Sequence, residues 1–240
     1  MSSEREYYRS YPWYDPARAV VRTAGRQIRD RASRYFRGRL IEIGCGTKAK
    51  RHLVGEFVDE HVGLDHRDCP HDPSNIDLFG SADAIPAPDA SFDCALSTAV
   101  LEHLEEPEAA LREACRVLRP GAYAVYTAPL FWHLHEEPRD FFRYTRFGLE
   151  HLFRRAGFEI VEITPLSGFW ITFGSATSYY VQRFARGLLR YPVRCVVGAI
   201  QWIVPRLDRG RFRDERFTWM YLAVVRKPPA EGDTGPVAPR

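Results

Sequence analysis

Short apolar runs of strand length alternate with helix-like segments along most of the chain, and this alternation is the feature that most constrains the fold. Strands are predicted at 40–43, 61–64, 76–79, 92–97, 122–127, 158–163 and 217–225, and helices at 17–36, 49–57, 107–118 and 145–156. An alternation of this kind is typical of a mostly parallel sheet with helices on both faces. The sequence therefore predicts an α/β protein.

One connection in this pattern is too short for a helix. Eleven residues, 65–75, separate the second and third predicted strands, and they include Pro70 and Pro73. A parallel crossover normally needs about a dozen residues or more. We therefore expect the helix between these two strands to be missing or reduced to a turn.

Composition narrows the class of protein further. The chain has 240 residues, 45% of them hydrophobic, and a net charge of +3, which exclude a wholly disordered chain. No apolar run reaches the roughly 18 residues of a membrane-spanning helix, and the N-terminus is charged where a signal peptide would be apolar. The five cysteines form no C-x-x-C pair. These features predict a cytoplasmic protein. Such a protein could also contact the inner face of the membrane from the cytoplasmic side.

The small net charge is an average over segments of opposite sign. Residues 1–39 carry +6, residues 40–181 carry −10, residues 182–227 carry +8, and residues 228–240 carry −1. We predict an aromatic N-terminal segment with an amphipathic helix at 1–37, a main domain at 38–227 with a helical insertion at 165–216, and a disordered tail at 228–240.

The first predicted strand ends in a glycine turn that suits a nucleoside cofactor. Gly44 and Gly46 let the backbone approach a ligand closely, and Asp65, at the end of the next strand, could accept the ribose hydroxyls. With Ala49 the same turn also fits the G-x-G-x-x-(G/A) pattern of dinucleotide-binding proteins. The turn alone thus leaves the choice between a nicotinamide cofactor and another nucleoside open.

Three further segments make the pattern specific. The stretch 82–93 (ADAIPAPDASFD), the run 100–104 (VLEHL) and the run 116–121 (RVLRPG) follow the glycine turn in order. Together they resemble class I S-adenosylmethionine-dependent methyltransferases, in particular the type 11 subgroup, over residues 38–165. The resemblance implies a Rossmann-like, seven-stranded, mostly parallel sheet whose last strand is antiparallel. Lys48 departs from the family, which has a third glycine there.

The resemblance also implies a cofactor site for S-adenosyl-L-methionine. Glu42 would organise the methionine amino end, the glycine turn would approach the cofactor, Asp65 would bind the ribose, and Asp83 would take the adenine amino group. The full set of implied cofactor-binding residues is Glu42, Gly44, Cys45, Gly46, Asp65, His66, Asp83, Ala84, Thr98 and Ala99.

The acceptor side is expected in the loop 129–145, which is rich in histidine, acids, arginine and aromatic residues. His135 is the first candidate for a general base, because its ordinary pKa lies near neutral, and His133 is the second. Asp140 and Arg143 are either catalytic or paired with each other, and Tyr144 completes the candidate set. A metal held by His133, His135 and Glu136 is the weaker interpretation, so no metal is expected.

The insertion 165–216 allows three interpretations. It could form a lid over the acceptor pocket, a homodimer face, or a peripheral membrane contact through 176–213, where arginines flank apolar residues. The arginines lack the aromatic interleaving of an RNA-binding module, so no nucleic acid partner is expected.

The sequence as a whole predicts methyl transfer from S-adenosylmethionine to an oxygen of a sugar-containing, lipid-linked or other small acceptor. Two alternatives stay open at this point. One is an NAD-dependent oxidoreductase that uses the same glycine turn. The other, suggested by Lys48, is a protein that binds S-adenosylmethionine without catalysing a reaction.

Overall fold

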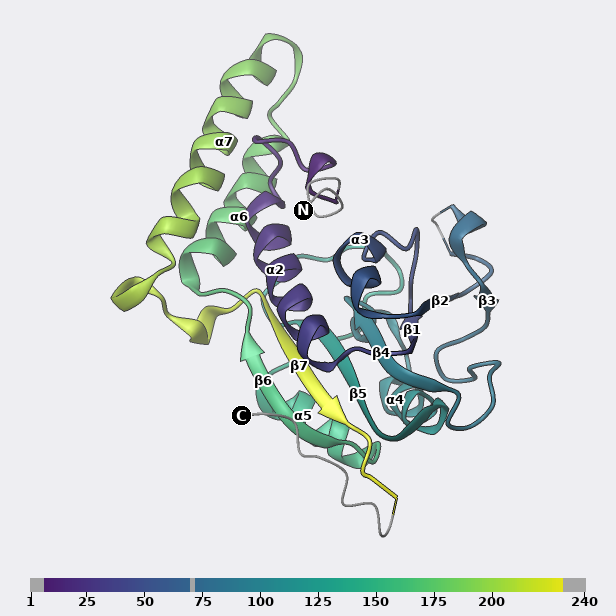
Figure 1. The fold of residues 1–240 in the computed structure, drawn as a ribbon. Coiled ribbons are helices and arrows are strands. Elements are labelled where there is room, and N and C mark those ends of the chain that lie inside the picture. The colour runs from purple at the N-terminus through teal and green to yellow at the C-terminus, as the bar shows by residue number, and fades with distance from the viewer. Residues whose placement is uncertain (1–6, 70–71, 231–240) are drawn as a thin grey trace.

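The computed structural model describes residues 7–69 and 72–230, and its core is a seven-stranded sheet in the order β3-β2-β1-β4-β5-β7-β6 (Figure 1). The strands β1 to β5 run parallel, and β7 lies antiparallel between β5 and β6. This arrangement confirms the predicted Rossmann-like sheet with an antiparallel last strand. The strands are β1 (Arg39–Ile43), β2 (Glu60–Asp65), β3 (Leu78–Phe79), β4 (Phe92–Thr98), β5 (Leu118–Pro129), β6 (Glu159–Pro165) and β7 (Met220–Arg226).

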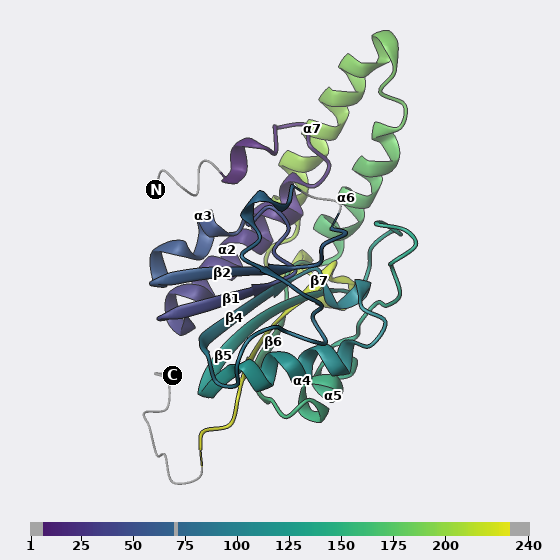
Figure 2. The same ribbon diagram turned by 90° about the vertical axis from the view of Figure 1, so that its right-hand side faces the viewer.

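Helices cover both faces of the sheet, as Figure 2 shows. The helices α2 (Arg18–Tyr35) and α3 (Arg51–Val54) pack on one face, while α4 (Pro107–Val117) and α5 (Arg146–Arg155) pack on the other. Burial of an apolar stripe explains each position; Val20, Ile28 and Ala32 of α2, for example, are all buried. Thr145 caps α5 by accepting a hydrogen bond from the Gly148 N–H, at 3.0 Å.

Two short segments of the sheet bear on the predicted strand boundaries. The link between β2 and β3 contains only a 3₁₀ turn, Pro73–Asn75, and β3 has two residues, as the short connection predicted. The predicted helix 107–118 ends as expected, at Val117, but β5 begins at Leu118 instead of 122 and pairs there with Phe92. Pairing of β5 with β7 begins only at Tyr123, so the missing N–H of Pro120 costs the sheet no ladder bond on that side.

Two helices between β6 and β7 form an arm that projects beyond the sheet (Figures 1 and 2). They are α6 (Phe169–Gln182) and α7 (Arg190–Leu207), joined through the 3₁₀ turn Gly187–Leu189. A Cβ atom on Gly174 would lie 2.4 Å from Cγ1 of Val204, so glycine permits their close packing. Buried Gln201 ties the arm to α2, since its Oε1 accepts from the Ala19 N–H at 2.8 Å. Within the described residues no helix is long and apolar enough to span a bilayer. Most of the predicted tail lies outside those residues.

Asp208 locks the base of the arm. Its buried carboxylate accepts hydrogen bonds from the N–H groups of Gly168, at 2.7 Å, and Trp170, at 3.1 Å, and thereby satisfies the free N-terminal donors of α6. The end of α7 thus fixes the start of α6.

We expect Asp208→Ala to lower the free energy of unfolding by about 1–3 kcal/mol, because two buried N–H groups would lose their acceptor. Asp59→Ala, which removes an exposed carboxylate, is the matched control. Urea denaturation measures both, and equal stability of the two variants would show that the Asp208 cap contributes nothing.

Candidate functional site

A cavity of about 920 Å³ lies beyond the carboxyl ends of β1, β2 and β4. The turn after β1 forms its floor, with Gly44, Cys45 and Gly46, and the ends of β2 and β4 contribute Asp65, His66, Thr98 and Ala99. These are positions at which ligands bind in open parallel sheets. Eight of the ten cofactor-binding residues implied by the resemblance, Asp83 among them, therefore line one cavity.

Three residues of the turn after β1 have positive φ angles: 70° at Gly44, 51° at Gly46 and 55° at Lys48. Lys48 therefore adopts the left-handed conformation that the family's third glycine would adopt with less strain. Its nearly buried side chain compensates by passing beneath β2, where Nζ donates to the His61 carbonyl at 2.9 Å and pairs with the Asp77 carboxylate. The departure at Lys48 leaves the turn intact.

Asp65 joins this turn to the end of β2. One carboxylate oxygen accepts from the Gly46 N–H at 2.6 Å, and the other accepts from the His66 N–H at 2.7 Å. A carboxylate offers about four acceptor positions, so Asp65 keeps capacity for the hydroxyls of a ribose. The backbone bonds also hold the carboxylate at a fixed place on the cavity wall.

The electrostatics of the lining favour a cationic ligand. The lining contains seven carboxylates against two cationic side chains; the carboxylates are Asp65, Asp68, Asp83, Glu105, Glu106, Glu136 and Glu137, and the cations are Lys50 and Arg139. Such a lining attracts a sulfonium and repels the diphosphate of a dinucleotide. The acidic lining therefore fits S-adenosylmethionine: carboxylates can accept hydrogen bonds from the ribose hydroxyls and the adenine amino group, and they surround the cationic end with negative charge.

Two of the implied cofactor residues do not line the cavity. Glu42 is buried beneath the sheet, where its carboxylate lies 2.8 Å from Nε2 of His61. Because side chains alternate along a strand, Glu42 shares the face of Leu40, which packs toward α2. Ala84 lies in a turn closed by the bond from its N–H to the Ser81 carbonyl. Glu42 and Ala84 therefore do not line the cavity, and their roles in cofactor binding stay predictions.

Asp140 and Arg143 hold the histidine-rich loop between β5 and α5 in shape. Their two hydrogen bonds measure 2.6 and 2.8 Å, and Asp140 also accepts from the His135 N–H at 3.0 Å. The Arg143 guanidinium holds the pKa of the nearly buried Asp140 well below its usual range. Arg143 further donates to the carbonyls of Trp132 and His133. Asp140 and Arg143 thus pair with each other and position the loop, although the loop forms no helix at these residues.

Tyr144 is also structural. Its ring is buried, and its hydroxyl donates to the Leu101 carbonyl at 2.8 Å. Burial raises the pKa of this hydroxyl further above neutral. The hydroxyl is thus committed inside the fold, which removes Tyr144 from the catalytic candidates.

The two candidate bases lie beside the cavity. The ring of His135 packs edge-on against His103, which lines the cavity, with ring centroids 4.8 Å apart. His133 packs 4.9 Å from Tyr179 of α6. Burial, followed by the charges of His135 and Arg143, lowers the pKa of His133 and keeps its imidazole neutral at pH 7. Neutral imidazoles are competent proton acceptors.

Glu102 is the functional candidate that the sequence did not reveal. It is fully buried, and neither carboxyl oxygen has a hydrogen-bond partner in the part of the chain that the structure describes. Burial raises its pKa to about 8. One atom each from Glu102, His103 and His135 lie within 4.8 Å of one another, a geometry that could share a proton or hold a metal ion. The feature of the sequence that could have indicated Glu102 is its place between Leu101 and Leu104 in an apolar run.

Comparison with known proteins places the chain in a family. A family model described as a methyltransferase domain matches residues 5–163. The chain belongs to this family, that of the class I S-adenosylmethionine-dependent methyltransferases, and its sheet agrees with that membership. S-Adenosylmethionine is accordingly the cofactor of its class. This membership and the acidic lining overturn the nicotinamide alternative.

Two O-methyltransferases share less than a third of their aligned residues with this chain. An O-methyltransferase of Aspergillus nomiae is 29% identical over 46% of this chain and 57% of its own length. An O-methyltransferase of Penicillium expansum is 26% identical over 64% of this chain and 66% of its own. The chain thus spans less than two thirds of either relative. The crystal structure of the cyclase SpnF superposes with a TM-score of 0.55 at 22% identity, covering 85% of this chain and 81% of that one, and supports the fold alone.

We expect Asp65→Ala to weaken binding of S-adenosylhomocysteine by about 1–3 kcal/mol, roughly a factor of 5 to 150, because the ribose acceptor and the support of the glycine turn are both lost. Asp68→Ala, which removes another carboxylate of the same lining, is the control. Titration calorimetry measures both, and an affinity unchanged by Asp65→Ala would contradict the ribose assignment.

Glu102 also gives a pH prediction. Its pKa rises from 4.5 in the unfolded chain to about 8 in the fold, so its contribution to stability is full below pH 4.5 and is lost as the pH rises through about 8. Glu102→Gln stays neutral, and we expect its melting temperature to fall less than that of the wild type between about pH 5 and about pH 9. If the melting temperatures of the wild type and Glu102→Gln changed in parallel with pH, the Glu102 carboxyl would not be buried without a partner.

Proposed function

We propose that the chain transfers the methyl group of S-adenosylmethionine to an oxygen atom of a small acceptor. The observation that carries this proposal is the acidic cavity whose wall, at His103, meets the ring of His135. The O-methyltransferase names of the Aspergillus nomiae and Penicillium expansum relatives support the choice of oxygen.

The reaction is a displacement at carbon. S-Adenosylmethionine supplies a methyl group that its sulfonium activates. The acceptor oxygen forms a bond to that carbon while the carbon–sulfur bond breaks, and the acceptor loses its hydroxyl proton. Alignment supplies most of the rate, since effective molarities for well-oriented groups reach about 10⁵–10⁸ M. The cavity walls would provide the alignment.

His135 is the proposed proton acceptor. The bond from its backbone N–H to Asp140 fixes the residue, while its ring stays partly exposed beside His103. A carboxyl oxygen of Glu102 lies within 4.8 Å of ring nitrogens of His103 and His135, close enough to share the proton. His133 is the second candidate, on the side of α6.

The surroundings of these histidines support a sugar-containing or lipid-linked acceptor. Trp132 packs against Tyr179 and Trp219, and Phe131 packs against Phe173, so the base of the arm and the loop build an aromatic wall. Aromatic faces with adjacent imidazoles and carboxylates suit the apolar faces and hydroxyls of a sugar ring. A lipid-linked acceptor would approach along the arm.

We expect His135→Ala to lower kcat for methyl transfer by about 10²–10⁴-fold, the usual contribution of a general base, with little change in S-adenosylhomocysteine affinity. His151→Ala, an exposed histidine of α5, is the control. Transfer of tritiated methyl from S-adenosylmethionine to a panel of glycosides and phenols measures the rate.

Equal losses of kcat and affinity in His135→Ala would indicate a structural role instead. Tight S-adenosylhomocysteine binding by the wild type, with no transfer to any acceptor of the panel, would favour the non-catalytic alternative.

A further inference from the structure

The arm formed by α6 and α7 exposes large apolar side chains far from the sheet. Leu188, at its tip, is 86% exposed, and Trp202, on α7, is 62% exposed. Other members of this surface are Phe184, Leu189, Val196 and Ile203. Large apolar side chains exposed together on one pair of helices are disfavoured in water and usually mark a contact with a partner or a membrane.

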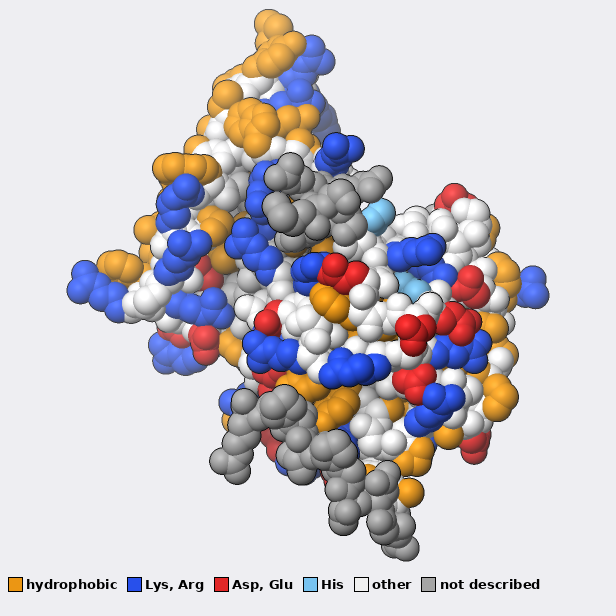
Figure 3. Space-filling view, in the orientation of Figure 1, with side chains coloured by type: hydrophobic (Ala, Val, Ile, Leu, Met, Phe, Trp, Pro, Cys, Tyr) orange, Lys and Arg blue, Asp and Glu red, His pale blue; other side chains and the backbone are white. Residues whose placement is uncertain are grey.

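The charge of the arm selects the kind of partner. No Asp or Glu occurs between Glu162 and Asp208, whereas Arg183, Arg186, Arg190, Arg194 and Arg206 fall in that interval. Figure 3 shows orange and blue side chains sharing the outer part of the arm. Arginines beside aliphatic and aromatic residues match the boundary between anionic headgroups and acyl chains.

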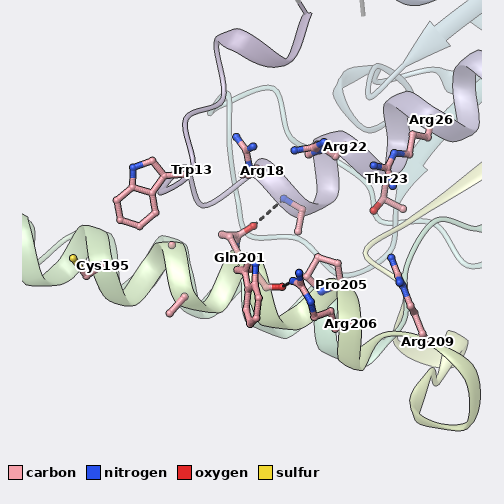
Figure 4. Close-up of a pocket in the computed structure, with 14 residues that line it drawn as sticks. Trp13, Arg18, Arg22, Thr23, Arg26, Cys195, Gln201, Pro205, Arg206 and Arg209 are labelled. Atoms are coloured by element: carbon pink, nitrogen blue, oxygen red, sulfur yellow. Dashed lines mark hydrogen bonds between the residues drawn. The ribbon is translucent and has the colours of Figure 1, made fainter. Parts of the chain in front are cut away.

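A groove of about 720 Å³ between α2 and α7 continues this surface. Arg18, Arg22 and Arg26 follow each other at intervals of four residues on α2, and Arg206 and Arg209 face them from the α7 side (Figure 4). Trp202 lines the groove and also belongs to the exposed apolar surface, so the two are continuous.

The five arginines of the groove have no carboxylate partner within the described residues. The carboxylate of nearby Asp15 accepts from the Ala17 N–H at the start of α2. Arg18 donates to the Tyr11 carbonyl, and the Arg206 guanidinium stacks on Trp202, 3.6 Å from the ring centroid. Like charges concentrated in a concave site call for an anion, and guanidinium groups bind phosphate oxygens in pairs.

We propose that the arm and the groove together dock on an anionic phospholipid bilayer, the apolar side chains entering the interface and the arginines of the groove binding headgroup phosphates. The packing of Tyr179 on His133 links this surface to the acceptor side of the cavity. The docking does not depend on methyl transfer and can be tested without it.

Vesicle flotation of the full chain tests the proposal. At low salt the protein should float with vesicles of phosphatidylcholine and phosphatidylglycerol and stay behind with phosphatidylcholine alone. The triple variant Arg22→Gln, Arg26→Gln, Arg209→Gln should bind the anionic vesicles about a hundredfold more weakly, because each basic side chain near an anionic surface contributes about fivefold.

Two further variants test whether the position of the arginines and the apolar tip of the arm matter for vesicle binding. Arg112→Gln, Arg154→Gln, Arg155→Gln removes the same charge from exposed positions on α4 and α5 and should float like the wild type. Leu188→Ser with Leu189→Ser changes only exposed side chains at the tip and should also lose vesicle binding. Unchanged S-adenosylhomocysteine affinity verifies the fold of each variant.

Three results would overturn the proposal. The first is that the wild-type protein does not float with anionic vesicles. The second is that the two triple arginine variants weaken vesicle binding equally. The third is that the surface binds something other than a membrane. In the absence of vesicle binding, saturable binding of inorganic phosphate would show this, and so would a concentration-dependent dimer in sedimentation velocity that the leucine substitutions abolish.

Discussion

The carboxylate of Asp65 is the interaction on which the rest of the site depends. It binds the backbone of the turn after β1 through the Gly46 N–H and its own strand end through the His66 N–H. The ends of two parallel strands are thereby held at one distance, and the floor of the cavity is fixed before any ligand enters. Lys48 supports the same turn from below through Asp77, which in turn accepts from the Gly63 N–H at 2.6 Å.

The sequence predicted the sheet because strand and helix periodicities are local properties. It predicted the cavity as well, because the ends of parallel strands converge wherever the sheet is laid out. Lys48 shows the limit of this reasoning. A lysine in place of a glycine suggested a damaged turn, but its long side chain reaches Asp77, 29 residues along the chain, and no local pattern reveals that partner.

Glu42 and Tyr144 show that residue type alone does not predict the direction of a side chain. Glu42 and Tyr144 are chemically suited to a site, yet one faces α2 and the other is held by the Leu101 carbonyl. Glu102 is the opposite case, because its residue type did not mark it as a site residue. Only its burial without a hydrogen-bond partner distinguishes it from an ordinary acid at the start of a helical turn. Residue type is visible in a sequence, whereas orientation and desolvation arise from packing.

The acidic cavity meets a histidine cluster at one wall, and the basic arm lies beyond that cluster. We propose that the cofactor binds in this cavity with its reactive end toward the histidines. A crystal structure with bound S-adenosylhomocysteine tests this placement most directly. We predict the ribose hydroxyls on Asp65, the adenine beside Asp83 and the sulfur on the side of His103 and His135. Adenosine bound elsewhere, or a sulfur directed away from the two histidines, would contradict the account.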